Sequence, residues 1–286
     1  MTTLTAVILT RNEEENLPDC LASLKDFAQR VVVVDSGSTD ATREIALSMG
    51  AEFLEHPFEN YARQFNWALD NADIRTDWVL RIDADERMTP AVIQECRSIM
   101  DGGDAEICGI IMQATFYMMG KPLNHGMRKK RKLMIFRRGA ARIENRNMDE
   151  HTVLSRGRSV SIRARFDHMD FKSIDHFVQK LNWYASREVL DVLGDNFSGG
   201  DQHAMQDASI ARTRKLKSGL YYRFPMFLRA WLLFLYCYIF RLGFLDGKEG
   251  LIYNFLYAYM YRFVVDAKLY EARKTGHYNR APGALK

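Results

Sequence analysis

Residues 77–86, DWVLRIDADE, join a short apolar segment to a closely spaced pair of aspartates. The apolar part predicts a buried strand, and Thr89-Pro90 after it indicates a helix start, with Thr89 as N-cap. Asp83 and Asp85 therefore fall where a strand ends in a loop. In extended backbone, residues two apart point to the same side, so we expect both carboxylates to face one site. Mg²⁺ or Mn²⁺ would relieve their mutual repulsion, although a simple polar turn fits an Asp-x-Asp pattern about equally well.

Strands and helices are expected to alternate over the first hundred residues. The apolar patterns predict four strands and three helices, with strands at 4–9, 31–34, 51–54 and 78–82 and helices at 17–27, 41–49 and 60–72. This order is typical of a doubly wound parallel sheet, in which ligands bind at the carboxyl ends of the strands. The polar loops after the first, second and fourth strands would meet at that edge.

The pattern changes after residue 100. Further strands are predicted at 107–117, at 133–136 and near Val153, and a helix is predicted at about 173–193. We therefore predict one domain at 1–224, with a first half at about 1–100 and a second half at about 101–224. A helical segment at 225–275 and a loose tail at 276–286 would follow.

The predicted helical segment carries long apolar stretches beside basic residues. Residues 230–240 are unbroken apolar sequence, which is too short to cross a bilayer because crossing takes about 20 residues. A second helix at 249–272 shows an apolar stripe, with Asn254, Arg262 and Asp266 on the opposite side. Aromatic rings flanked by Arg and Lys suit a membrane interface, so we expect a helical pair that lies in one leaflet. Packing on the catalytic domain, or an oligomer interface, is the alternative.

The amino-acid composition is that of an ordinary globular protein. A net charge of +4 over 286 residues does not indicate nucleic-acid binding, and none is expected. The four cysteines show no metal-ligand spacing, and the N-terminus lacks a signal-peptide pattern. We therefore expect a cytoplasmic protein that associates peripherally or monotopically with the inner membrane.

Ordered motifs carry a family resemblance. VILTRNEE at 7–14, VDSGSTD at 34–40, ARQFN at 62–66 and DADE at 83–86 together resemble the family 2 glycosyltransferases, inverting enzymes of the GT-A fold. RKLMIFRR at 131–138, DEH at 149–151 and RLGFLDG at 241–247 resemble a bacterial subgroup that includes lipopolysaccharide-core glucosyltransferases and relatives that act on lipid-linked glycans. The resemblance implies an α/β GT-A fold, a Rossmann-like mixed sheet with flanking helices, followed by a C-terminal helical membrane-associating hairpin. It also implies that 1–224 is a glycosyltransferase domain, with a nucleotide-binding half at about 1–100 and an acceptor-binding half at about 101–224.

The resemblance also implies a nucleotide-sugar donor, with a UDP-hexose favoured, and Mg²⁺ or Mn²⁺ as cofactor. Asp85 would bind the ion directly, and Asp83 would hold the ribose or a metal-bound water. Asp35 would accept a hydrogen bond from uracil, with a helix-capping or turn role as its alternative. Thr10 and Glu13 would lie near the base and ribose.

Two further basic positions and an amide belong to the same implied donor site. Arg63 and Asn66 lie three apart on one helix face, where Arg63 would meet the base or ribose unless it is a solvated surface residue. Arg131 belongs to the basic segment 128–132, which would grip the donor diphosphate or the phosphates of a lipid carrier. A solvated charge run and nucleic-acid binding are the other interpretations of that segment.

An inverting transfer needs one base to deprotonate the acceptor hydroxyl. Glu150 is the first candidate for this base and Asp149 the second, in a motif that the subgroup often writes as Val-His-Glu. Pairing of these acids with nearby arginines is the alternative. The acceptor would be a lipid-linked oligosaccharide or lipopolysaccharide core at the cytosolic face of the membrane, and a homo-oligomer is open.

Two rival functions fit an α/β chain with acidic residues at the sheet edge. A nucleotidyltransferase acting on sugar phosphates would normally open with a glycine-rich phosphate loop, whereas residues 10–16 contain no glycine. A non-catalytic membrane-bound glycan-binding protein would not need the acidic residues to be intact.

Overall fold

The computed structural model describes residues 2–126, 131–144, 151–193, 221 and 224–276. The chain divides into two compact units. The first comprises Met1–Thr115 with Lys129–Asp170, and the second comprises Phe116–Arg128 with Phe171–Lys286. The predicted helix at 173–193 therefore falls with the C-terminal helices, whereas the sequence-based division placed it in the acceptor-binding half.

The first unit begins with a four-stranded parallel sheet. Its strands stand in the order β3 (Glu52–Glu55), β2 (Arg30–Asp35), β1 (Leu4–Thr10) and β4 (Trp78–Asp83). The intervening helices are α1 (Leu17–Leu24), α2 (Thr42–Ser48) and α3 (Tyr61–Asn71). All seven elements agree with the sequence prediction to within a few residues.

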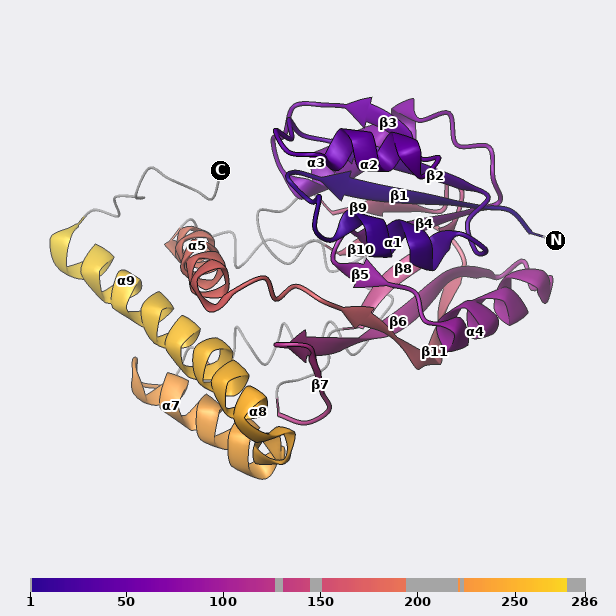
Figure 1. The fold of residues 1–286 in the computed structure, drawn as a ribbon. Helices are drawn as coiled ribbons and strands as arrows, with labels where there is room; N and C mark the ends of the chain where they lie inside the picture. The colour runs from indigo at the N-terminus through magenta and orange to yellow at the C-terminus, as the bar shows by residue number, and fades with distance from the viewer. Residues whose placement is uncertain (1, 127–130, 145–150, 194–220, 222–223, 277–286) are drawn as a thin grey trace. The chain divides into compact units, whose positions relative to one another are not determined.

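Both faces of this parallel sheet are covered. Val7 and Ile8 point to opposite faces of β1, and both are fully buried. Helix α3 packs on the face of Val7, while α1 and α2 are drawn together in front of the sheet in Figure 1. Burial on both faces explains why β1 and β2 read as continuous apolar runs.

Further strands complete the sheet beyond β4, the first of them antiparallel to β4. They follow in the order β8 (Arg131–Arg137), β6 (Ile107–Met118), β11 (Arg158–His168) and β5 (Glu86–Arg87). Helix α4 (Pro90–Asp101) contacts β11, and β9 (Ala141–Ile143) pairs with β10 (Thr152–Leu154) in a small separate sheet. The expected mixed sheet with flanking helices is confirmed, although β11 and β5 had not been predicted.

The second unit is mainly helical. It contains β7 (Lys121–Leu123), α5 (Ile174–Leu193), α7 (Leu228–Leu235), α8 (Gly247–Asn254) and α9 (Tyr261–Thr275). π-Helical segments at Tyr236–Phe240 and Phe255–Met260 extend α7 and join α8 to α9. No single helix among the described residues has the length and apolarity to cross a bilayer. The bent pair Leu228–Phe240 and Gly243–Thr275, with an angle of 70°, meets both criteria when taken together.

The polar side of the C-terminal helices faces inward, a direction that the apolar stripe alone had left open. Asp266 is 1% exposed and bonds to Arg229, and Arg262 bonds to Glu188 of α5 at 2.8 Å. Leu251, by contrast, is 43% exposed. Because the polar side chains find charged partners inside the unit, part of the apolar stripe is left outside.

Candidate active site

The carboxyl ends of three parallel strands place the acidic residues along one edge of the sheet. Thr10 lies opposite Asp35 in the β1–β2 register, and Leu9 lies opposite Asp83 in the β1–β4 register. Residues 84–85 form a turn rather than the extended backbone that we expected. The turn still brings one carboxylate oxygen each of Asp83, Asp85 and Glu86 within 4.8 Å of one another.

Asp83 is held by two side chains from other elements. Lys132 Nζ in β8 donates to Asp83 Oδ2 at 2.7 Å and to Glu86 Oε1 at 2.7 Å. Tyr61, the first residue of α3, donates its hydroxyl to Asp83 Oδ1 at 2.7 Å. Both carboxylate oxygens of Asp83 are therefore bonded within the protein.

Arg81 extends this network below the sheet edge. Its Nε donates to the Tyr61 hydroxyl at 2.9 Å, and its guanidinium lies 4.4 Å from the centre of the Tyr61 ring. Its Nη1 donates to Thr152 Oγ1 in β10 at 3.2 Å. A chain of polar contacts thus links β10, β4 and α3 to Asp83.

The network fixes the charges of its members. Burial alone would raise the pKa of Asp83, but the charges of Lys132 and Arg81 outweigh it and hold that pKa well below the usual range. Burial would lower the pKa of Lys132, but Asp83 and Glu86 raise it above its ordinary value. Asp83 is therefore an anion and Lys132 a cation at neutral pH.

Asp85 faces a different set of residues. His168 Nδ1, at the end of β11, lies 3.7 Å from Asp85 Oδ1, and His168 Nε2 lies 3.9 Å from Asp170. Ligand atoms of Asp85, His168 and Asp170 all lie within 4.8 Å of one another. Asp85 Oδ1 is buried and accepts no hydrogen bond from the residues that the structure describes. Two carboxylates and an imidazole at this spacing can hold a divalent ion.

The pairing of β11 with β5 explains this second set. His168 lies opposite Glu86 in the register, and the Met169 amide donates to the Asp85 carbonyl at 2.8 Å. Burial would lower the pKa of His168, but the charge of Asp85 and a hydrogen bond to Glu86 raise it. The strand that the sequence prediction omitted thus brings a histidine to the aspartate pair.

Asp35 is surrounded by its own loop. Its Oδ1 accepts from the hydroxyls of Thr10, at 2.8 Å, and Ser38, at 2.5 Å. Its Oδ2 accepts from the amides of Gly37 and Ser38 at 2.8 and 2.7 Å. These contacts are those of the turn role left open by the sequence. Uracil recognition by Asp35 and Thr10 stays a prediction.

Comparison with known proteins identifies the family. Residues 5–163 match the sequence profile described as Glycosyl transferase family 2, and this match spans more than half of the 286 residues. The chain belongs to this family. As a family 2 glycosyltransferase it has the GT-A type of mixed sheet with flanking helices that its motifs led us to expect.

Two relatives illustrate how this glycosyltransferase compares with curated proteins. A glycosyltransferase of Rickettsia typhi is 28% identical over 213 residues, which cover 69% of this chain and 71% of the relative. The lipopolysaccharide core biosynthesis glycosyltransferase LpsC of Rhizobium meliloti is 33% identical over 147 residues, covering 49% of this chain and 53% of LpsC. This match thus spans about half the length of LpsC.

Solved structures give a more distant likeness. Glucosyl-3-phosphoglycerate synthase from Mycobacterium tuberculosis, in complex with Mn²⁺, UDP and glucosyl-3-phosphoglycerate, is 21% identical with a TM-score of 0.33, covering 41% of this chain and 44% of that one. Mannosyl-3-phosphoglycerate synthase from Rubrobacter xylanophilus is 22% identical with a TM-score of 0.34, covering 40% of each chain.

Other predicted donor-site residues of the glycosyltransferase have local partners. Asn66 exchanges two hydrogen bonds with the backbone of Ile143, at 2.9 and 3.0 Å, and so ties α3 to β9. Arg63 is 58% exposed and pairs with Glu59, as its surface alternative predicts. The donor-site roles of Asn66 and Arg63 stay predictions.

Glu13 and Arg131 also form hydrogen bonds with other side chains of the chain. Glu13 accepts a hydrogen bond from Asn16 at 2.8 Å, and Arg131 donates to Ser161 at 2.6 Å. Their nucleotide-binding roles are still predictions. The two candidate bases, Glu150 and Asp149, lie outside the described residues.

Several members of the acidic site were not predicted from the sequence. Tyr61, Arg81 and Asp170 were given no role, and Lys132 was grouped with the basic segment 128–132, for which binding of phosphates and a solvated charge run were both considered. One signal was available for Lys132, because it directly precedes the apolar residues 133–136 and so falls within the strand. The fold alone brings His168 and Asp170 to Asp85 from more than eighty residues away in the sequence.

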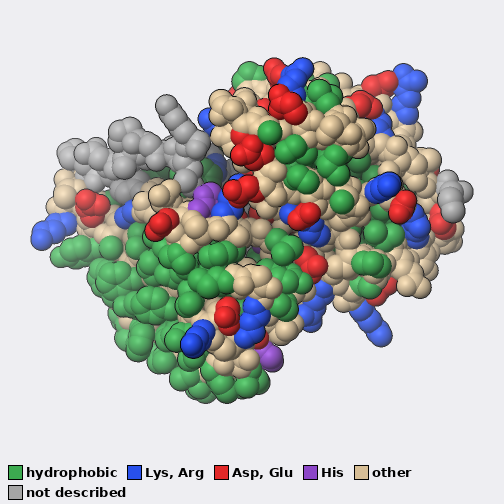
Figure 2. All heavy atoms as spheres, in the orientation of Figure 1, with side chains coloured by type: hydrophobic (Ala, Val, Ile, Leu, Met, Phe, Trp, Pro, Cys, Tyr) green, Lys and Arg blue, Asp and Glu red, His purple; other side chains and the backbone are tan. Residues whose placement is uncertain are grey.

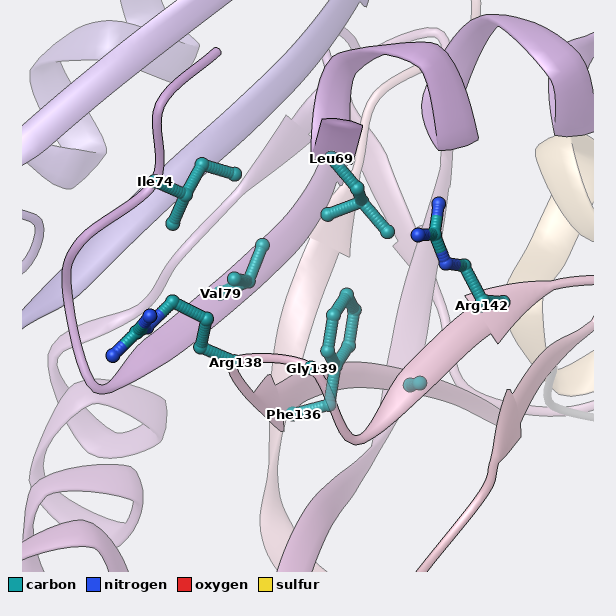
Figure 3. Close-up of a pocket in the computed structure, with 8 residues that line it drawn as sticks. Leu69, Ile74, Val79, Phe136, Arg138, Gly139 and Arg142 are labelled. Carbon is teal, nitrogen blue, oxygen red and sulfur yellow. The ribbon is translucent and has the colours of Figure 1, made fainter. Parts of the chain in front are cut away.

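A cavity of about 240 Å³ lies away from the acidic residues (Figure 3). Val79 and Phe136 line it, with Arg138 and Arg142 at its sides. Val79 lies four residues before Asp83 in β4, about 13 Å along the strand. The cavity is therefore separate from the candidate active site.

Proposed function

We propose that this chain is a metal-dependent inverting glycosyltransferase that moves a hexose from a UDP-sugar to a lipid-linked or lipopolysaccharide-type glycan. The observation that carries the metal part is the buried Asp85 Oδ1, which lacks a hydrogen-bond donor among the described residues and lies beside His168 and Asp170. His168 Nδ1, at 3.7 Å from this oxygen, is too far away for a hydrogen bond, and a buried carboxylate oxygen without one is costly unless a cation lies beside it. The residues therefore fit Mg²⁺ or Mn²⁺.

The protein groups would divide the work of the transfer. Asp85, with His168 and Asp170, would hold the ion, which when bound neutralises the diphosphate of the departing nucleotide as a Lewis acid. Asp83, fixed by Lys132 and Tyr61, would present its carboxylate to the ribose side of the donor. Glu150 would take the proton from the acceptor hydroxyl, with Asp149 as the second candidate.

The acceptor side of the proposal draws on the helical unit. Figure 2 shows hydrophobic side chains gathered over α7, α8 and α9. Phe240 is 76% exposed and Leu245 is 55% exposed, whereas Arg229 and Asp266 are buried. Helices that face lipid typically bury their charged side chains inside the protein and expose their apolar side chains. We assign this face to the cytosolic surface of a membrane, where the lipid-anchored acceptor and the enzyme would meet at high effective concentration.

The similarity to LpsC supports the acceptor class. The name of that relative refers to lipopolysaccharide core biosynthesis, and its match of 33% identity covers 49% of this chain. The particular sugar is not specified by these observations, so the proposal extends only to the class of donor and acceptor.

One experiment tests whether turnover and thermal stability depend on the nucleotide and the metal. The purified protein is incubated with Mn²⁺ and each UDP-sugar, and slow release of UDP is measured together with the thermal midpoint. We expect UDP with Mn²⁺ to raise the midpoint, because ligands that bind only the folded state stabilise it. D85N should remove most of this shift, while D26N, at an exposed carboxylate, should retain it.

Other outcomes would favour the rival functions. Release of pyrophosphate from a nucleoside triphosphate and a sugar phosphate would indicate a nucleotidyltransferase. Glycan binding with no turnover of any nucleotide sugar would indicate a binding protein. An equal midpoint shift in D85N and the wild type would contradict the assignment of the metal to Asp85.

A further inference from the structure

Lys132 places a positive charge inside the sheet, next to the aspartate pair. Its side chain is 10% exposed, and its ammonium group bonds to Asp83 Oδ2 and Glu86 Oε1 at 2.7 Å each. Glu86 is 1% exposed, and its other carboxylate oxygen accepts from the Asp83 amide at 3.1 Å. Lys132 thus closes a ring of contacts that joins Asp83 to Glu86.

The ammonium group occupies the position that a cation shared by Asp83 and Glu86 would need. Oxygens of Asp83, Asp85 and Glu86 lie within 4.8 Å of one another, which is a spacing that can hold a divalent ion. Such an ion takes carboxylate oxygens at about 2.0–2.6 Å. It would therefore compete with Lys132 for the same two oxygens.

Among the four charged residues joined around Asp83, the charges balance only when Lys132 is included. Arg81 and Lys132 are positive, Asp83 and Glu86 are negative, and all four are joined directly or through Tyr61. Removing one member of a buried set leaves an uncompensated charge, which is strongly unfavourable. Loss of Lys132 would leave an excess negative charge beside Asp85.

We propose that Lys132 is a positioning residue that serves as the internal counterion of Asp83 and Glu86 and so restricts the divalent ion to Asp85, His168 and Asp170. The inference rests on the proposed function for the second half of this statement only. Lys132 on Asp83 Oδ2 and Tyr61 on Asp83 Oδ1 together orient the carboxylate before any nucleotide binds. Such orientation is the usual task of residues behind a functional side chain.

The test counts bound Mn²⁺ by electron paramagnetic resonance of the free ion. Wild type, K132M and the double variant K132M/D83N are compared after circular dichroism has established that each is folded. We expect K132M to bind one more Mn²⁺ per chain than the wild type, because the ammonium group no longer occupies the space between Asp83 and Glu86. The double variant should return to the wild-type count, since Asp83 no longer offers a carboxylate.

A control and a second variant keep the test decisive. R138M removes an exposed positive charge just after β8 and should leave the Mn²⁺ count unchanged. If K132M does not fold, K132Q retains an amide donor for the carboxylates and should show the same gain. A folded Lys132 variant that binds no more Mn²⁺ than the wild type overturns the inference.

The two proposals fail in distinguishable ways. The gain of Mn²⁺ is counted relative to the wild type, so it supports the counterion role whether the wild type itself binds one ion or none. Absence of turnover with every UDP-sugar and acceptor would overturn the proposed function and would leave that gain unaffected.

Discussion

At the scale of single residues, the buried charges at the sheet edge make stability depend on pH. The pKa of Asp83 is held well below its unfolded value of about 4 by Lys132 and Arg81, against the opposing effect of burial. A group with a depressed folded-state pKa stabilises the protein above its unfolded pKa. That contribution is lost as the pH falls towards the folded-state pKa.

D83N should therefore flatten the acid side of the stability profile. We expect the wild-type free energy of unfolding to fall more steeply than that of D83N between about pH 5 and pH 2, because only the wild type takes up this proton on unfolding. Urea denaturation at a series of pH values measures the slopes. D26N, which alters an exposed carboxylate, should keep the wild-type slope. Parallel profiles for D83N and wild type would contradict the depressed pKa.

The identity of the catalytic base can also be tested by single substitutions. E150Q should lower the rate of transfer by about two to four orders of magnitude, the usual contribution of general-base catalysis. UDP binding, followed by the thermal midpoint, should be retained, because the base acts on the acceptor. D149N is the matched control and should transfer sugar at close to the wild-type rate. If E150Q turns over normally and D149N does not, Asp149 is the base.

The residues predicted from the sequence and those found in the structure differ for a physical reason. Asp83 and Asp85 could be identified because a strand followed by acids is visible in a local pattern. Lys132 and His168 could not be placed beside them, because β8 and β11 join the sheet through long-range pairing. The sequence alone does not indicate whether a charged side chain will have a buried ion-pair partner in the folded protein.

At the scale of elements, the strongest local patterns predicted best. Strands β1 and β2 are continuous apolar runs because both of their faces are buried, and they were assigned correctly. Strand β11 mixes Arg, Ser and apolar residues and has mostly half-buried side chains, so it gave no clear period. In α9 the apolar and polar sides were recognised, but which side faces inward depends on partners in α5 and α7.

The buried ion pair between α7 and α9 should matter for the stability of the helical unit mainly when only one of its two partners is removed. Arg229 and Asp266 are 4% and 1% exposed, and Asp266 also accepts from the Phe227 amide at 2.7 Å. R229M alone should lower the free energy of unfolding by about 3–5 kcal/mol, because it leaves a buried carboxylate without its cation. R229M/D266L should regain most of this loss, as measured by urea denaturation.

A solvent-exposed ion pair provides the comparison for R229M. Arg43 and Glu55 are 54% and 66% exposed, so R43M should cost no more than about 1 kcal/mol. Equal costs for R43M and R229M would mean that the Arg229 pair is not buried from water in solution.

At the scale of the whole molecule, the chain combines a sheet-based unit of ordinary polarity with a helical unit that exposes hydrocarbon. Large exposed apolar patches mark interaction sites on proteins. Binding to a membrane and binding to a second copy of the chain can be distinguished by their concentration dependence. Attachment to a bilayer depends on the amount of lipid, whereas self-association depends on the amount of protein.

F240E/L245E should detach the protein from membranes. Phe240 and Leu245 are 76% and 55% exposed, and burying such side chains in lipid is worth about 1.5–3 kcal/mol each, so two charges should reduce vesicle binding by about tenfold or more. Co-sedimentation with vesicles of bacterial phospholipid measures the change. L47E/M49E, which alters two exposed apolar side chains of the first unit, should sediment like the wild type, because that unit is not assigned to the membrane. Unchanged sedimentation of F240E/L245E, together with loss of a dimer in analytical ultracentrifugation, would assign the apolar face to contact between copies of the chain instead.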